Sequence, residues 1–321
     1  MIRKLRYCRR CVAHIYLRAV SGFVVFYSVK DILVFFTLLN VLSETYGIRI
    51  CVVSIMLNHF HLLIEAENHN AIAKFMKELS RRFTAEFNGR ISRKGRLFEG
   101  PFGLSVKAED KKVRTAISYL YNNPVENKHC RKAEMAQWNF LAYSVSDHPF
   151  SEKLVLRNAS GRLKRGVREI RWMRSLKKPL NYAALDRISE GLDTREIKQL
   201  TDFIVNEYSR IDHERAVRFY ASRDEMIRAT DSNAGNEHDI LEEKPSDDRP
   251  YFRMLKKLSM DPRFRSPKDV LRLSEKDRWQ IAEEFLQRGM GPKWQILRLL
   301  HLKLPTLVRR ARHRGSLPRR P

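Results

Sequence analysis

Two kinds of hydrophobic pattern alternate along the first 150 residues. Short apolar, β-branched or alternating stretches predict strands over 13–20, 22–28, 48–57, 59–67 and 97–106. Apolar residues three or four positions apart predict helices over 31–46, 71–88 and 110–123. This order of strands and helices predicts an α+β fold, in which an antiparallel sheet of ferredoxin-like type carries helices on one face.

Beyond residue 150 the strand patterns fade and helical spacing dominates. Periodic segments at 161–176, 182–190, 194–208 and 215–219 predict a mainly α-helical region. The stretch 231–250 is polar and acidic and contains Gly and Pro, which is typical of a linker. We therefore expect four parts: an α+β domain over 1–150, a helical extension over 151–230, a linker over 231–250 and a last helical module over 251–321.

The composition is that of a folded, soluble chain. With 321 residues, 43% of them hydrophobic, the sequence is long and apolar enough for packed cores, which excludes collagen, low-complexity disorder and a disulfide-stapled miniprotein. Its longest apolar runs, such as 32–36, are far shorter than the roughly 20 residues of a membrane span. The beginning of the sequence has no signal-peptide cleavage pattern, so a cytoplasmic protein is expected.

The charge changes this picture most. Lys and Arg number 62 against 37 Asp and Glu, which gives a net charge of +25. A basic surface that serves solubility is one reading, but balanced charge would serve solubility equally well, so a nucleic-acid partner and association with the nucleoid are favoured. Arg309, Arg310 and Arg312 lie in a final segment without acidic residues, as expected of a helix end or tail that neutralises phosphates.

The predicted strand over 59–67 carries the first candidate chemistry. Because side chains alternate between the faces of a strand, His59 and His61 point to one side while Phe60 and Leu62 point to the other. Two neutral imidazoles at this spacing can share a divalent cation. On spacing alone, a metal site and a structural histidine pair remain equally plausible.

The second candidate lies on the predicted helix over 110–123. Tyr119 and Asn123 are spaced i, i+4 and share one flank of the helix, so a phenol and an amide can act together. Tyr121 falls on another flank and is interpreted as a packed aromatic residue. Pro124 predicts that Asn123 is the last helical residue.

Several ordered motifs carry a family resemblance. The sequence HFH at 59–61, followed on a later helix by YLYNNPV at 119–125, resembles the HUH single-tyrosine transposases. Within them it is most similar to the transposases associated with repetitive extragenic palindromes, a likeness that extends to HIYLR at 14–18 and GRLFE at 95–99. The resemblance covers about residues 10–145. Two positions depart from the family pattern: Leu57 stands where proline is usual, and Phe60 replaces an aliphatic residue.

The resemblance implies a metal-dependent transposase and endonuclease that cleaves and rejoins hairpin-bearing single-stranded DNA. His59 and His61 would hold Mg²⁺ or Mn²⁺ with Asn123 as third ligand, and Tyr119 would be the nucleophile that forms a 5′-phosphotyrosine. The protein would act as a monomer or a homodimer. In relaxases the tyrosine precedes the histidine pair, and replication initiators usually carry a lysine after the tyrosine, so both fit less well.

Two other functions stay open. One is a domesticated DNA-binding protein that keeps the fold without catalysis. The other is a carboxylate-dependent nuclease, although the sequence shows no convergent acidic set.

Three basic segments are further candidates for contacts with DNA. Lys74, Lys77 and Arg81 occupy a basic helix, where the alternative is a solvated helix face. Near the C-terminus, a helical pair followed by a segment at 306–314 suggests a helix-turn-helix, with ordinary three-helix packing nearly as plausible. The segment 162–178, which contains Trp172, either follows a single strand through charge and stacking or is a surface helix.

The four cysteines provide little evidence for a metal. Cys8 and Cys11 have C-x-x-C spacing, but Cys51 and Cys130 do not form a second pair. Free thiols are therefore expected.

Overall fold

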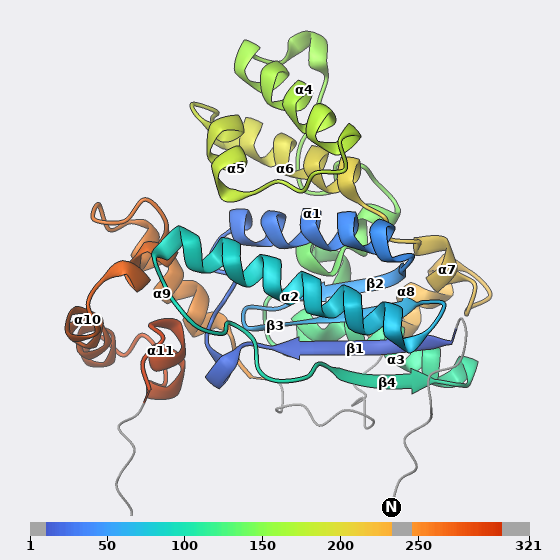
Figure 1. Cartoon of the computed structure of the whole chain (residues 1–321), viewed down its shortest axis with the longest axis horizontal. Coiled ribbons are helices and arrows are strands. Elements are labelled where there is room, and N and C mark those ends of the chain that lie inside the picture. The colour runs from blue at the N-terminus through green and yellow to red at the C-terminus, as the bar shows by residue number, and fades with distance from the viewer. Residues whose placement is uncertain (1–10, 233–245, 304–321) are drawn as a thin grey trace, which may run out of the picture.

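The computed structural model describes residues 11–232 and 246–303. Its first part contains four strands and three long helices (Figure 1): β1 (Val12–Arg18), α1 (Val29–Tyr46), β2 (Arg49–Ile55), β3 (His59–Glu65), α2 (His69–Ile91), β4 (Gly103–Lys107) and α3 (Asp110–Glu126). The strands form one antiparallel sheet in the order β2-β3-β1-β4. This is the ferredoxin-like order, and the predicted fold class is confirmed.

Helices cover both faces of the sheet. Phe60 and Leu62 of β3 belong to the core that α1 and α2 share with the sheet. Leu63 instead packs with Val113 and Ile117 of α3. The prediction of helices on one face thus describes α1 and α2, while α3 lies on the opposite face because its own apolar stripe needs a second surface to bury.

Local signals explain where the helices begin and end. Ser28 and Asp31 form a capping box at the start of α1, and Gly47 with φ 63° ends that helix. The side chain of Asn68 accepts a hydrogen bond from Ala71 N at the start of α2. These ends match the sequence pattern to within a few residues.

Three expectations for the first 150 residues were wrong. Residues 22–28 are not a strand, because their backbone groups bond to other partners: Val24 N donates to Arg298 O, and Phe26 N donates to Leu57 O. The strand expected over 97–106 begins only at Gly103. Helix α3 continues through Pro124, and the Asn127 side chain donates to the Asn123 carbonyl at 3.0 Å, which stabilises the last turn.

The rest of the described chain is helical, as predicted. Its α-helices are α4 (Gly161–Ser175), α5 (Tyr182–Ser189), α6 (Thr194–Tyr208), α7 (His213–Val217), α8 (Arg223–Ser232), α9 (Arg249–Ser259), α10 (Glu275–Gln287) and α11 (Lys293–Leu299). A 3₁₀ helix, η6 (Pro267–Arg272), follows α9. None of the helices within 11–232 and 246–303 is long and apolar enough to cross a bilayer.

Some of these helices pack on α1, and others lie at one end of the molecule. Helices α5 and α6 pack on the side of α1 that faces away from the sheet, and α4 lies beyond them at the top of Figure 1. Helix α1 is therefore buried on two sides, which explains its almost continuous apolar sequence from Ile32 to Leu42. Helices α9, α10 and α11 gather at the end of the molecule near the start of α1.

Some predicted features lie outside the described residues. They are most of the linker over 231–250, the segment 306–314 and the three arginines Arg309, Arg310 and Arg312.

Candidate active site

The sheet face under α3 carries the two candidate histidines. His59 and His61 lie on the same face of β3 as Leu63, which packs against α3. Phe60 and Leu62 point from the other face into the core under α1 and α2. The centroids of the two imidazole rings are 4.9 Å apart and the rings are nearly perpendicular. The strand alternation seen in the sequence thus places both imidazoles in one layer of the molecule.

Helix α3 brings Tyr119 to this layer. The Tyr119 ring meets His61 edge to face with centroids 5.9 Å apart, and it is only 7% exposed. Asn123 follows one turn later, and its Oδ1 accepts a hydrogen bond of 2.9 Å from Asn127 Nδ2. Tyr121 lies elsewhere on α3, fully buried among apolar residues, as interpreted from the sequence.

Strand β1 adds a third imidazole that the sequence analysis did not include among the site residues. His14 is completely buried, and its Nε2 lies 3.0 Å from His61 Nδ1. It also faces Tyr119, with ring centroids 6.2 Å apart. The signal was present in the segment HIYLR at 14–18, because alternation places His14, Tyr16 and Arg18 on one face of a strand.

Tyr16 and Gly103 form the wall beside His61. The Tyr16 and His61 rings are stacked with centroids 6.2 Å apart. Gly103 is opposite Tyr16 in the sheet, and a Cβ at Gly103 would come within 2.0 Å of the Tyr16 ring. The absence of a side chain at Gly103 therefore gives the Tyr16 ring its position.

A short hydrogen-bond chain determines the tautomer of His59. Asn58 Nδ2 donates to the Gly22 carbonyl at 3.1 Å, which identifies Asn58 Oδ1 as the acceptor facing His59 Nδ1 at 2.6 Å. His59 Nδ1 must therefore carry the proton. Its Nε2 keeps the lone pair that can bind a cation.

Burial and neighbouring charges keep the imidazoles of His14 and His59 neutral. Burial lowers the pKa of His14 well below 6.5, and the charges of His61 and Lys107 lower it further. Burial also lowers the pKa of His59 well below that value, with smaller contributions from His61 and Arg18. A neutral ring is the form that ligates metals, so the low pKa of His59 suits it as a ligand at pH 7.

Part of the chain matches a known protein family. Residues 10–123 match the family model described as "Transposase IS200 like", a segment that includes His59, His61, Tyr119 and Asn123. This part of the chain, the IS200-like segment, is therefore similar to the IS200-like transposases. The IS200-like segment ends three residues before the end of α3, so β1 to β4 and nearly all of α3 lie within the family match.

One solved structure is also similar, a tyrosine transposase associated with REP sequences that is bound to a REP hairpin. It has 13% sequence identity and a TM-score of 0.38, and the match covers 45% of this chain and 86% of that one. No curated protein matches the chain.

The donor set of the IS200-like segment suits a divalent cation in part. His59 and His61 supply two neutral imidazoles on one face. Within the described residues no three His, Cys, Asp or Glu side chains are grouped to hold a metal. The carboxamide oxygen of Asn123 has two lone pairs, of which Asn127 uses one. The assignment of Asn123 as third ligand stays a prediction.

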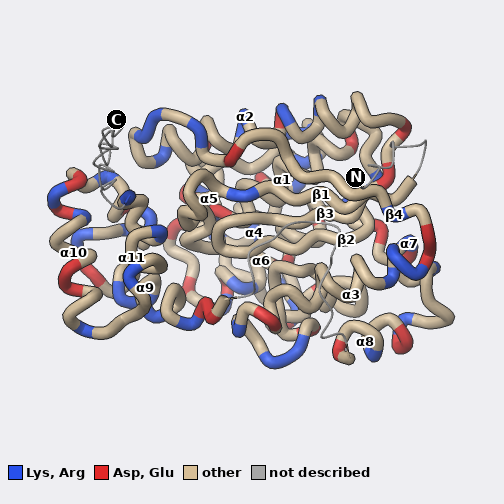
Figure 2. Tube along the Cα trace, turned by 90° about the horizontal axis from the view of Figure 1, so that it is seen from below, with Lys and Arg blue, Asp and Glu red and all other residues tan. Residues whose placement is uncertain are grey.

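The predicted DNA contacts on α2 lie on its exposed side. Lys74, Lys77 and Arg81 are all exposed, and Arg81 already forms two hydrogen bonds with Glu78, at 2.9 and 2.7 Å. A groove of about 490 Å³ beside α2 is lined by Lys77, Arg81 and Arg96. Figure 2 shows that Lys and Arg positions also occur along α9 and α11, so positive charge is not confined to the IS200-like segment.

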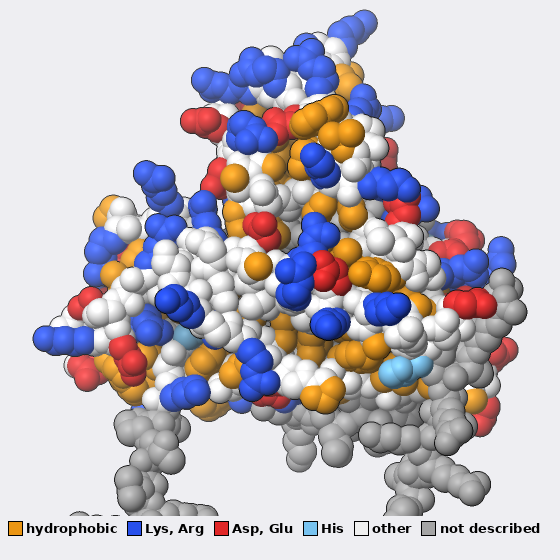
Figure 3. All heavy atoms as spheres, viewed as in Figure 1, with side chains coloured by type: hydrophobic (Ala, Val, Ile, Leu, Met, Phe, Trp, Pro, Cys, Tyr) orange, Lys and Arg blue, Asp and Glu red, His pale blue; other side chains and the backbone are white. Residues whose placement is uncertain are grey.

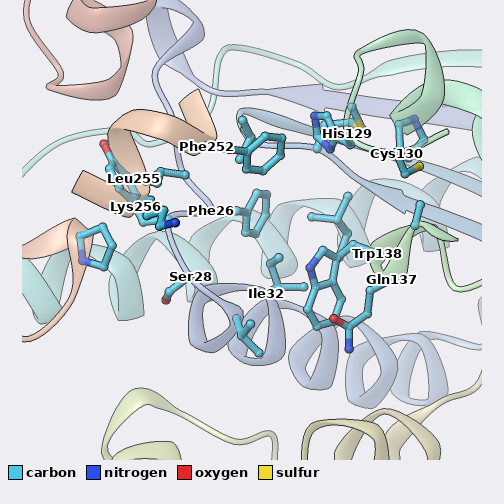
Figure 4. A pocket seen from close by; sticks show the side chains of 18 of the residues that line it. Phe26, Ser28, Ile32, His129, Cys130, Gln137, Trp138, Phe252, Leu255 and Lys256 are labelled. Atoms are coloured by element: carbon cyan, nitrogen blue, oxygen red, sulfur yellow. The ribbon is translucent and has the colours of Figure 1, made fainter. Parts of the chain in front are cut away.

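A cavity lies between residues of the α+β part and α9. It has a volume of about 450 Å³ and is lined by Leu57 and Pro124, the chain neighbours of Asn58 and Asn123, and by Phe252 of α9 (Figure 4). Helix α9, which lies outside the family match, therefore contributes to the wall of this cavity.

The cysteines depart from expectation at one position. Cys11 is disulfide-bonded, whereas Cys51 and Cys130 are free. The expectation of free thiols is therefore wrong for Cys11.

Proposed function

We propose that this chain is a metal-dependent transposase and endonuclease that cleaves and rejoins hairpin-bearing single-stranded DNA through a 5′-phosphotyrosine. The observation that carries the proposal is the contact between Tyr119 and His61, whose ring centroids are 5.9 Å apart inside the segment that matches the IS200-like transposases. The net charge of +25 supports a polyanionic substrate. The proposal that this substrate carries a hairpin rests on the family resemblance.

In the proposed reaction, the hydroxyl oxygen of Tyr119 attacks the scissile phosphorus. A bond forms between that oxygen and phosphorus, the bond from phosphorus to the 3′ oxygen breaks, and the phenol proton ends on the free 3′ hydroxyl. Because the phosphodiester energy is retained in the phosphotyrosine, a second 3′ hydroxyl can reverse the step without ATP. Reversal by a different strand end is the strand transfer that transposition requires.

The other residues of the site position these groups. Asn58 holds His59 in the Nδ1–H tautomer, and His14 and Tyr16 hold the ring of His61 from two sides. His59, His61 and Asn123 would hold Mg²⁺ or Mn²⁺, which when bound withdraws charge from the scissile phosphate. The low exposure of Tyr119 limits the access of bulk water to the attacking oxygen.

A covalent-adduct assay tests the proposal. The full chain, incubated with Mn²⁺ and a library of hairpin-bearing single strands, should yield a protein–DNA species that survives denaturation. Tyr119→Phe and His61→Ala should abolish it. Tyr121→Phe is the matched control, because it removes a hydroxyl from the same helix at a residue packed in the apolar core.

The same assay separates the alternatives. If no adduct forms across the library while DNA binding persists, the chain is a DNA-binding protein that keeps the fold without catalysis. Cleavage that survives the loss of both histidines would instead indicate carboxylate-dependent chemistry.

A further inference from the structure

Helix α4 presents a basic outer face at the top of the molecule in Figure 1. Its apolar residues Leu163, Val167 and Ile170 are buried against α5 and α6. Arg165 and Arg168 are exposed on the other side. Figures 1 and 3 show α4 at the top of the molecule, where Lys and Arg side chains gather, with α1 and the sheet between this surface and α3.

Several positive charges of this region already have partners within the protein. Arg162 donates to the Gly191 carbonyl and Lys164 to the Arg157 carbonyl. Others in the region pair with acids or stack on rings: Arg174 and Lys177 with Glu44, and Arg171 on Phe203. The single acid of α4, Glu169, pairs with Arg187 of α5.

Arg165 and Arg168 differ from these residues. Neither guanidinium forms a hydrogen bond or ion pair with the part of the chain that the structure describes, and both are exposed. They lie three residues apart and so share one side of the helix. Two positive charges are thus oriented toward solvent, and the neighbouring Glu169 forms its ion pair with Arg187 instead of with either of them.

Trp172 lies on the same side of α4 as Arg165 and Arg168, and the three residues form a stripe along the helix. It lies one turn after Arg168, it is 58% exposed, and Leu176 one turn later is 45% exposed. A large exposed indole beside arginines is the arrangement with which proteins stack on unpaired bases while guanidinium groups contact the adjacent phosphates. The stripe from residue 165 to residue 172 is about 10 Å long at the rise of an α-helix, long enough for a few nucleotides.

We propose that Arg165, Arg168 and Trp172 form a second binding surface, which takes single-stranded nucleic acid. Trp172 stacks on a base, and the two arginines contact phosphates. A duplex would offer phosphates but no accessible base face, so the exposed indole favours a single strand. This surface is separate from Tyr119 and does not depend on the proposed chemistry.

Binding of fluorescein-labelled dT20 by the full chain carrying Tyr119→Phe, followed by fluorescence anisotropy, tests the proposal. Trp172→Ala should weaken binding about tenfold, whereas Trp172→Phe should retain most of it. The double variant Arg165→Glu/Arg168→Glu should weaken binding and reduce the slope of log K against log salt by about 1.4, or about 0.7 for each lost phosphate contact. Lys257→Glu/Lys276→Glu, an equal charge reversal at exposed positions of α9 and α10, is the control.

Three results would overturn the proposal. The first is a loss of dT20 binding in the control pair as large as that in the α4 pair. The second is a Trp172→Ala protein that binds dT20 as tightly as its parent. The third is a Trp172→Ala effect on anionic phosphatidylserine vesicles but not on dT20, which would assign the face to a membrane. The adduct assay with Tyr119 restored tests the proposed strand transfer separately from this surface. If the strand transfer fails, no variant forms an adduct, but the effects of the α4 variants on dT20 binding persist.

Discussion

Asp31, at the start of α1, forms a fully buried ion pair with Lys268 of η6. Their exposed fractions are 0% and 2%, although 237 positions separate them in the chain. The Tyr182 hydroxyl of α5 donates to the same Asp31 oxygen at 2.7 Å, and Ser28 N donates to the other oxygen at 2.8 Å. The Lys268 ammonium also lies 3.7 Å from the centre of the Tyr182 ring. One carboxylate thus joins the α+β part, the helical extension and the C-terminal module.

Removing one partner of this pair should destabilise the fold strongly. Lys268→Met leaves the buried Asp31 carboxylate without its countercharge, and we expect a loss of about 3–5 kcal/mol in the free energy of unfolding, measured by urea titration. Lys30→Met is the matched control, because Lys30 and Asp186 form an exposed pair worth about 0–1 kcal/mol. Equal losses in the two variants would refute the structural role of Lys268.

Acid should weaken the docking of the C-terminal module through His301. This ring bonds to the Val24 carbonyl at 2.7 Å and stacks on Phe23, and burial lowers its pKa to about 3. Since the unfolded chain takes up this proton near pH 6.5 and the folded chain does not, stability is fully present above about pH 6.5 and falls as the pH drops toward 3. As the pH falls from 6.5 to 5, His301 should lower the free energy of unfolding by about 2 kcal/mol.

His301→Gln should therefore flatten the dependence of the unfolding free energy on pH between 7.5 and 5. Any cost of fitting glutamine is the same at both pH values and does not change the slope. The same substitution at exposed His69 controls for the loss of an imidazole as such. An unchanged slope in His301→Gln would show that other groups cause the acid sensitivity.

Asn58 should control the metal affinity of His59. Asn58→Ala removes the acceptor that holds the Nδ1–H tautomer, and losing such a partner of a ligating histidine usually lowers metal affinity about 10- to 100-fold. Isothermal titration with Mn²⁺ measures this without reference to catalysis. Asn68→Ala, which removes the cap of α2, is the control and should bind Mn²⁺ as the parent protein does.

Gly103 should tolerate no side chain while Tyr16 is present. Gly103→Ala places a Cβ within 2.0 Å of the Tyr16 ring, and overpacking of this kind costs about 1–3 kcal/mol. Thermal melting should show the loss. The double variant Gly103→Ala/Tyr16→Ala should recover part of it relative to Tyr16→Ala alone, and a purely additive result would contradict the packing argument.

Most of the fold was predictable because its signals are local. The period of the apolar positions and the caps at Ser28 and Asn68 define α1 and α2. Alternation along β3 predicts that His59 and His61 share a face, and the spacing of Tyr119 and Asn123 predicts that they share a flank of α3. These inferences need only the geometry of one strand or one helix.

Two features were not predictable from the pattern of a single element. The apolar segment 22–28 looks like a strand, but it bonds to Arg298 and Leu57 instead of pairing in the sheet. Pro124 looks like a helix end, yet α3 continues because Asn127 supplies a hydrogen bond in the last turn. In both cases the partner that decides the conformation is a residue that a local pattern does not identify.

By itself the sequence determined most helices and strands of the α+β part, the positive charge and the shared strand face of His59 and His61, because each follows from residue type and short-range spacing. Only the tertiary structure decided that α3 covers the histidine face, that His14 bonds to His61, and that Lys268 neutralises Asp31. The physical reason is that hydrogen bonds and buried charges join residues far apart in the chain, and their partners are chosen by packing.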